Sequence, residues 1–178
     1  MPLNHPLHLA VAEALLQRIK GQGEIIRDPA CGGNQHIPLF VGEHRGRDTR
    51  MCLVDLLVVV SGQVRIIVEI EESGFLPTKI CGKFLQAALA THFIHDSRPE
   101  PALPYAEDVL FIQVLDGSKC LKHGSRKESQ AKLIMEQIRG KLPLKGSGIT
   151  DYQLFFVSGP SDRARLNLMA EAVAQALA

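Results

Sequence analysis

The chain has little of several features that would narrow its function at once. It contains no tryptophan and only two tyrosines. No stretch offers about 18 uncharged apolar residues, so we expect no membrane-spanning helix. The first residues lack a basic region, and Glu13 interrupts their apolar run, so we expect no secretory signal. The formal net charge of +1 excludes a polycation, so any contact with nucleic acid has to come from a local basic face.

The cysteines are few, and their spacing is not that of a disulfide framework or of a zinc site. No pair has the spacing CxxC, and the four positions are scattered: Cys31, Cys52, Cys81 and Cys120. A structural zinc ion needs four convergent ligands, whereas the sequence offers only local pairs such as Cys120 with His123. We therefore expect free thiols in a reducing cytoplasm.

Apolar residues make up 46% of the 178-residue chain, enough for one domain with a sizeable core. Hydrophobic spacing predicts helices over 4–20, 78–95, 126–140 and 161–177, and strands over 24–28, 36–41, 51–60, 64–72, 108–115 and 152–158. The strands 51–60 and 64–72 are apolar on both faces, which is typical of strands inside a sheet covered by helices on each side. The sequence therefore predicts an α/β fold with a mixed central sheet flanked by helices.

Three acidic residues interrupt these apolar strands in the segment VDLLVVVSGQVRIIVEIEESG, residues 54–74. If Ser61-Gly62-Gln63 is a three-residue loop, directly opposed residues have numbers that sum to 124, and Asp55 faces Glu69. Their Cβ atoms would then lie roughly 4.5–5.5 Å apart, with Glu71 on the same face as Glu69. A two-residue loop, Gly62-Gln63, would instead put Asp55 opposite Ile70 and turn both glutamates away.

Two explanations of these acids remain open at this point. Like charges opposite one another destabilise a sheet, but a divalent cation between them reverses that effect, and Mg²⁺ favours a site with one or two carboxylates. Alternatively, the acids lie at strand ends and are simply solvated. The sequence alone does not decide between a metal site and a hydrated strand exit.

An Asp, a hairpin of this length and an acid pair on the next strand resemble the core of the PD-(D/E)XK nuclease superfamily, the restriction-endonuclease-like fold. Its order of helix, three strands, helix and strand is similar to residues 5–115. The resemblance implies one nuclease-like domain over 1–178, with an αβββαβ core at about 5–115 and a C-terminal αβα extension at about 116–178. One departure is that Glu71 stands where the family usually has a lysine.

The resemblance implies a metal-dependent endonuclease that hydrolyses phosphodiester bonds of nucleic acid, in particular DNA. Asp55 and Glu69 would bind Mg²⁺ or Mn²⁺, and Glu13 on the first helix would help to hold a metal ion. Glu71, Lys79 or Lys83 would orient or deprotonate the attacking water. Glu13 and the two lysines can equally be solvated helix residues.

Cations that could bind phosphates gather in two places. Residues 117–145 carry eight basic residues against two acidic ones, and the candidates for nucleic-acid binding are Lys119, Lys122, Arg126 and Lys127. Before the Asp55 strand, the loop HRGRDTR supplies Arg45, Arg47 and Arg50. A solvated helix face and a polar surface loop are the alternatives.

Two other functions stay open. A nuclease-like domain without activity could bind nucleic acid or protein, and the missing lysine keeps this alternative open. The segment FFVSGPSDRARL, a strand leading into a helix start, could belong to an α/β domain that binds an anion or a nucleotide. If the chain cuts both strands of a duplex, one site per chain implies a homodimer or a partner protein.

Overall fold

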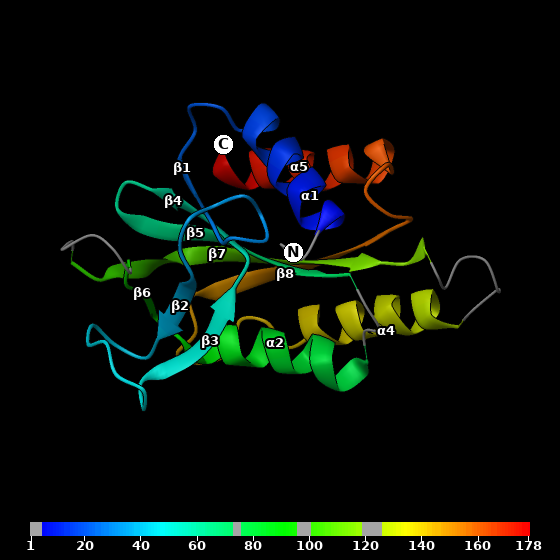
Figure 1. Cartoon of the computed structure of the whole chain (residues 1–178). Helices are drawn as coiled ribbons and strands as arrows, with labels where there is room; N and C mark the ends of the chain where they lie inside the picture. Colours follow the sequence, from blue (N-terminus) through cyan, green and yellow to red (C-terminus); the bar gives the residue numbers. More distant parts are fainter. Residues whose placement is uncertain (1–4, 73–75, 96–100, 119–125) are drawn as a thin grey trace.

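The apolar segments pair into one mixed sheet with helices on both sides (Figure 1). The structure is a computed structural model that describes residues 5–72, 76–95, 101–118 and 126–178. Its helices are α1 (Pro6–Arg18), α2 (Pro77–Leu89), α4 (Lys127–Arg139) and α5 (Arg163–Leu177). Its strands are β1 (Glu24–Arg27), β2 (Ile37–Phe40), β3 (Arg50–Val54), β4 (Leu56–Val60), β5 (Gln63–Glu71), β6 (His92–Phe93), β7 (Leu103–Asp116) and β8 (Ile149–Val157).

The sheet changes from antiparallel to parallel at its centre. β1, β4 and β5 are antiparallel neighbours, whereas β5, β7 and β8 run parallel. The parallel step from β5 to β7 requires a crossover, which α2 provides on one face of the sheet. β6, β2 and β3 continue from the first residues of β7 as a second antiparallel patch. The predicted mixed central sheet flanked by helices is confirmed.

β5 is covered by helices on both faces because its side chains alternate between two cores. Val68 and Ile70 belong to the cluster formed with α1 and α5, whereas Ile67 belongs to the cluster that contains Phe84 of α2. In Figure 1, α1 and α5 lie on one side of the sheet and α2 and α4 on the other. The expectation of a strand buried on both faces is therefore confirmed.

Two predicted boundaries are wrong. Residues 51–60 form two strands rather than one, because Asp55 breaks the run: β3 before it pairs with β2, and β4 after it pairs with β1 and β5. The helix expected over 78–95 ends at Leu89, since Ala90 is extended and the N–H of Thr91 donates to the carbonyl of Phe40, drawing the chain back into the sheet. In both places a long-range pairing replaces the locally predicted structure.

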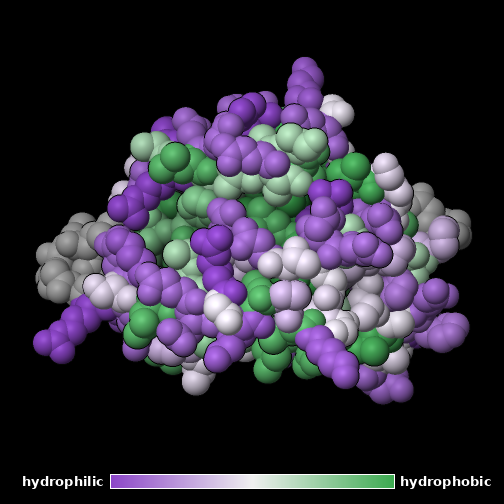
Figure 2. All heavy atoms as spheres, turned by 180° about the vertical axis from the view of Figure 1, so that it is seen from behind, coloured by the Kyte–Doolittle hydropathy of each residue, from purple (hydrophilic) through white to green (hydrophobic). Residues whose placement is uncertain are grey.

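The surface mixes polar and apolar patches. Figure 2 shows the back of the molecule, where green patches interrupt the polar surface, several of them along the lower edge formed by the layer of α2 and α4. Two exposed apolar side chains of this layer are Leu85 of α2 and Leu133 of α4, at 51% and 56% exposure. No helix among the described residues is both long and apolar enough to cross a membrane. The described cysteines, Cys31, Cys52 and Cys81, are free.

Candidate active site

The β4–β5 hairpin reaches its register by a route that differs from the prediction. Its turn has two residues, Ser61 and Gly62, both with positive φ, and Val60 faces Gln63. A bulge at Arg65 then adds one residue to β5. Beyond the bulge, Val58 faces Ile66 and Leu56 faces Val68, so the residue numbers sum to 124 as predicted. Both predicted turns are wrong, but the next step in this register sets Asp55 opposite Glu69.

Asp55 lies in the break between β3 and β4, where its carboxylate bonds to the neighbouring strand. Its Oδ2 accepts the N–H of Ile70 at 2.6 Å, and its own N–H donates to the carbonyl of Val68 at 3.3 Å. The side chain therefore replaces a backbone acceptor, which fixes its orientation at the open end of the hairpin. This contact also explains why the chain leaves strand geometry at Asp55.

Glu69 is the most deeply buried acid of the site, with only 1% of its surface exposed. In the register of the hairpin it lies opposite Asp55, and the Nζ of Lys83 on α2 lies 3.2 and 3.1 Å from its two carboxylate oxygens. Burial, followed by the negative charge of Asp55, raises the pKa of Glu69 well above its usual range, although Lys83 opposes both effects. Asp55, Glu69 and Lys83 therefore meet in one place.

Glu71 and Lys79 form a second pair one step further along the same face. Lys79 Nζ lies 2.5 Å from Glu71 Oε2, and the glutamate is buried whereas the lysine is 44% exposed. The two lysines reach the two glutamates because Lys79 and Lys83 are four residues apart on α2 and project from one side of the helix. The first two turns of α2 thus supply a cation for each acid of the Glu-Ile-Glu segment.

His8 and Asp28 also belong to this site, although the sequence analysis named neither. His8 Nε2 lies 3.7 Å from Asp55 Oδ1, and the N–H of Asp28 donates to the carbonyl of Asp55 at 3.0 Å. Burial lowers the pKa of His8, but the carboxylates of Asp55 and Glu72 outweigh it, and the pKa is raised overall. Burial also raises the pKa of Asp28, with a contribution from Asp55. No local motif marked these residues, because helix α1 meets the strand only in the folded chain.

Glu13, the acid predicted on the first helix, faces a different neighbour. Its carboxylate lies 3.7 Å from Arg163 on α5 and accepts a hydrogen bond from Gln17, and its side chain is 55% exposed. His8, rather than Glu13, is therefore the side chain that α1 directs at Asp55. Helical spacing alone does not show which of His8 and Glu13 faces Asp55, since the apolar stripe of this helix is broad.

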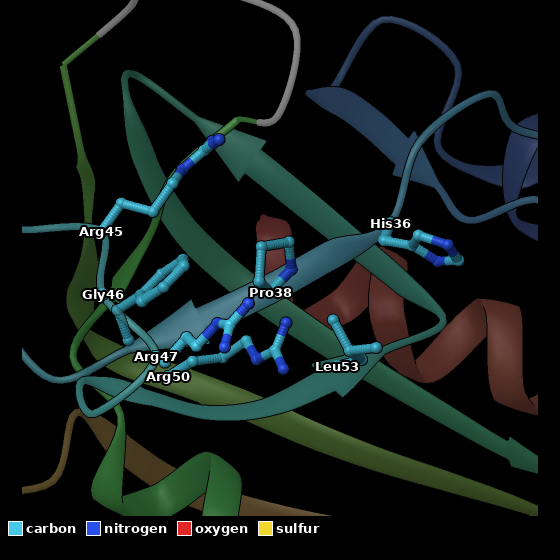
Figure 3. Close-up of a pocket in the computed structure, with 8 residues that line it drawn as sticks. His36, Pro38, Arg45, Gly46, Arg47, Arg50 and Leu53 are labelled. Carbon is cyan, nitrogen blue, oxygen red and sulfur yellow. The ribbon is translucent and has the colours of Figure 1, made fainter.

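The arginines of the loop before β3 divide into two groups. Arg47 and Arg50 line a groove of about 380 Å³ together with Pro38 and Leu53 of the β2–β3 hairpin. Figure 3 shows these two arginines side by side, with Arg45 pointing away from them. Arg45 also lines the groove, but it donates to the carbonyl of His95 at 2.7 Å and so ties the loop to the chain after β6. Besides Arg45, the groove thus presents two further arginines beside an apolar floor.

The basic segment is described only in part. Lys119 and Lys122 lie outside the described residues. Arg126 and Lys127 are exposed at the start of α4, close to the end of the sheet where β7 finishes (Figure 1). The predicted helix start is therefore correct to within one residue. The start of α4 lies toward the end of the sheet at which β7 finishes.

The donor set at Asp55 and Glu69 suits a hard cation. Two carboxylates that face each other, one of them buried, repel each other unless a proton or a cation lies between them. Oxygen ligands of this kind fit Mg²⁺ or Mn²⁺ rather than a soft metal. Comparison with known proteins finds no family model, curated protein or solved structure that matches the chain.

Proposed function

We propose that this protein is a metal-dependent nuclease that hydrolyses phosphodiester bonds in nucleic acid, with DNA as the substrate. The observation that carries the proposal is the strand register that sets Asp55 opposite Glu69, with Lys83 Nζ 3.1 Å from the Glu69 carboxylate. Two acids and a lysine on two adjacent strands and the following helix are what phosphodiester hydrolysis requires: ligands for a divalent ion and a cation for the phosphate. The order antiparallel β1–β4–β5 followed by parallel β7 supports the resemblance to the PD-(D/E)XK superfamily.

Asp55 and Glu69 would hold Mg²⁺ or Mn²⁺, with the carbonyl of Ile70 beside them. When bound, such an ion supplies positive charge to the phosphate and lowers the pKa of the attacking water. Lys83 acts as an ammonium group: burial lowers its pKa, but Glu69 and the other nearby acids outweigh that effect and raise it overall. It is therefore suited to neutralise charge and to orient Glu69, and not to accept a proton.

Glu71 is the remaining group that could accept a proton from water. It projects from the same face of β5 as Glu69, and its contact with the partly exposed Lys79 leaves the pair open to solvent on one side. The general base is therefore Glu71, which occupies the position where the PD-(D/E)XK superfamily usually has a lysine. Lys79 then fixes the direction of the Glu71 carboxylate.

Binding of the substrate would draw on the two basic regions. Arg47 and Arg50 offer phosphate contacts beside Pro38 and Leu53, whose apolar surface can pack against a sugar or a base. Arg126 and Lys127 extend the basic surface near the end of the sheet. Cleavage of both strands of a duplex would require two such sites, so we propose a homodimer or a partner protein, acting in the cytoplasm, where the free cysteines remain reduced.

The test is cleavage of plasmid, single-stranded DNA and RNA by the full chain in Mg²⁺, Mn²⁺ or EDTA. Asp55→Ala and Glu69→Ala should each lower the rate by about 1000-fold or more, since the charge of the metal site is halved. Glu13→Ala is the matched control and should cut at the wild-type rate, because its carboxylate faces Arg163. Activity that survives both site substitutions would overturn the assignment.

One observation favours a second function, a nuclease-like domain that binds without cutting. Glu69 and Glu71 are each already paired with a lysine, and this pairing neutralises the acids without any metal. Calorimetry with Mg²⁺ separates the two functions. Absence of metal binding and of cleavage, together with retained DNA binding, would favour the inactive domain.

A further inference from the structure

Three metal-ligating side chains meet at the start of α1, beside the site described above but distinct from its carboxylate pair. His5 Nδ1 lies 3.2 Å from Glu72 Oε2, and His8 Nδ1 lies 3.3 Å from Glu72 Oε1. One ligand atom from each residue can be chosen so that all lie within 4.8 Å of one another. His5 and His8 are three residues apart, which brings both imidazoles to one side of the first turn of the helix.

The carboxylate of Glu72 is held in place by hydrogen bonds from backbone N–H groups at the start of α1. Its Oε1 accepts the N–H groups of Leu7 at 2.6 Å and His8 at 3.2 Å, so it caps the N-terminus of α1. Its Oε2 faces His5. Although burial opposes the charge, hydrogen bonds from His8 and from the N–H of Leu7 lower the pKa of Glu72. A ligating carboxylate that is already ionised and oriented by hydrogen bonds is a well-prepared metal ligand.

His8 supplies an independent indication that the cluster has room for a ligand. Its side chain is only 9% exposed, and its Nδ1 has no hydrogen bond of acceptable alignment, although Glu72 Oε1 lies within ion-pair distance. A buried imidazole nitrogen without an aligned partner is costly unless another group satisfies it. A metal ion beside Glu72 would do so.

We propose that His5, His8 and Glu72 form a binding site for a transition-metal ion of the zinc class. Two imidazoles and one carboxylate are ligands for Zn²⁺ and its neighbours and not for Mg²⁺. Ligands of a tetrahedral zinc ion lie roughly 3.4 Å apart, so a contraction of up to about 1.4 Å along the widest edge would seat the ion. His5 is 33% exposed on its side chain, which leaves a path for the ion and a position for water.

This second metal ion would link the start of α1 to the end of β5. With Nδ1 on the metal, Nε2 of His8 carries the proton and faces Asp55 Oδ1 at 3.7 Å. That arrangement, carboxylate to histidine to metal, orients both ligand and acid. Since His8 must lose its second proton to bind, metal affinity rises with pH. The proposal does not rest on the nuclease function, because ligands and occupant are of a different kind.

The test is calorimetric titration of the full chain with Zn²⁺, together with the change in melting temperature that Zn²⁺ causes. The wild type should bind one ion per chain and melt at a higher temperature with Zn²⁺, because the ion binds only the folded site. His5→Ala and Glu72→Gln should each weaken binding by roughly tenfold or more and remove the temperature shift. Glu72→Gln keeps the oxygen that caps α1, so it should still fold.

Two controls make the result decisive. His44→Ala removes an exposed histidine outside the cluster and should bind Zn²⁺ like the wild type. Glu69→Ala removes a carboxylate of the other site and should also retain Zn²⁺ binding. Zn²⁺ binding that is absent in the wild type, unchanged in His5→Ala and Glu72→Gln, or lost in Glu69→Ala would overturn the proposal. Replacement by Co²⁺ should give the visible absorption of a tetrahedral ion in the wild type alone among these cluster variants.

Discussion

The two ends of the β4–β5 hairpin share the same two strands but differ in backbone conformation and in the charged groups that they carry. At the turn, Ser61 and Gly62 adopt positive φ in a tight, exposed connection without any charged group. At the open end, Asp55, Glu69 and Glu71 gather beside cations from another part of the chain. The turn and the bulge at Arg65 determine which side chains face each other, and the open end uses that alignment. The turn and the bulge thus determine the strand register, whereas the candidate catalytic residues lie at the opposite end of the same hairpin.

The negative charge of the acids at the open end is balanced by side chains from the helices on both faces of the sheet. α2 contributes Lys79 and Lys83 to one face of β5, whereas α1 brings His8 to Asp55 from the other layer. The acids therefore cannot be understood from the hairpin alone. Changes to the cations of the open end should have larger functional effects than changes near the turn, and the predictions below test this order.

Among substitutions of the cations at the open end, Lys83→Met should have the largest effect on cleavage. Removal of the ammonium group that lies 3.1 Å from Glu69 should lower the rate by about 100-fold or more, because its charge is no longer available to the phosphate. Lys79→Met is the matched comparison on the same helix and should cost about tenfold, since this lysine only orients Glu71. Steady-state rates at saturating Mg²⁺ measure both. Equal losses in the two variants would contradict the separate roles.

The same substitution should make stability depend more strongly on pH. Glu69 has a raised pKa in the folded chain, so the folded state binds its proton more tightly than the unfolded state. Stability from this group is therefore lost as pH rises from the ordinary glutamate pKa through the raised one. Without Lys83 the pKa of Glu69 rises further, and this loss extends to higher pH.

Urea unfolding should therefore show that Lys83→Met is close to wild type at pH 5 and less stable by about 2 kcal/mol at pH 8. Lys83→Arg keeps the charge and should show little of this pH dependence. A deficit of the same size at both pH values would mean that packing, and not the charge on Glu69, accounts for the loss.

A smaller effect is expected from deleting Arg65, the residue that forms the bulge. The deletion leaves Val58 opposite Ile66 and therefore keeps the alignment of Asp55 with Glu69. It removes the ion pair with Asp108 at 3.0 Å and a hydrogen bond to the carbonyl of Ala176, so unfolding should become easier by about 1–2 kcal/mol. Affinity for Mg²⁺ should stay within about twofold of the wild type.

Deletion of Ile67 is the comparison for this experiment. It lies beyond the bulge, so its loss turns Glu69 to the other face of β5 and should abolish Mg²⁺ binding. Calorimetry on both deletion variants distinguishes the two positions. If deletion of Arg65 eliminates metal binding as thoroughly, then the bulge does not absorb the extra residue.

The sequence predicts the sheet well because its central strands are long apolar runs, and such runs dominate over local propensity. Strand register also predicts that Asp55 lies opposite Glu69, whereas Lys79 and Lys83 are candidates only through the family resemblance. The sequence does not distinguish a three-residue loop from a two-residue turn with a later bulge, because both give the same sum of residue numbers. Ser61-Gly62 is a weaker turn signal than Asn-Gly.

Residues that depend on packing between distant segments were missed. His8 and Asp28 reach Asp55 only after α1 and the segment after β1 pack against the hairpin, and nothing in their immediate neighbours indicates this. The break at Asp55 was missed for the same reason, since the N–H of Ile70 that its side chain satisfies is remote in sequence. The pair His5 and His8 does carry a local signal, a three-residue spacing within the predicted helix 4–20.

The smallest expected effect belongs to the arginines of the groove in the β2–β3 hairpin. Arg47→Ala and Arg50→Ala each remove one cation beside Pro38 and Leu53, so each should weaken DNA binding by about threefold at moderate salt. Each loss should also reduce the dependence of affinity on salt by about one ion, while the cleavage rate of bound DNA stays unchanged. Arg45→Ala should not alter the salt dependence, because its guanidinium is bonded to the carbonyl of His95. Fluorescence titrations across a salt series measure these slopes, and a groove that contacts no phosphate would leave all three variants alike.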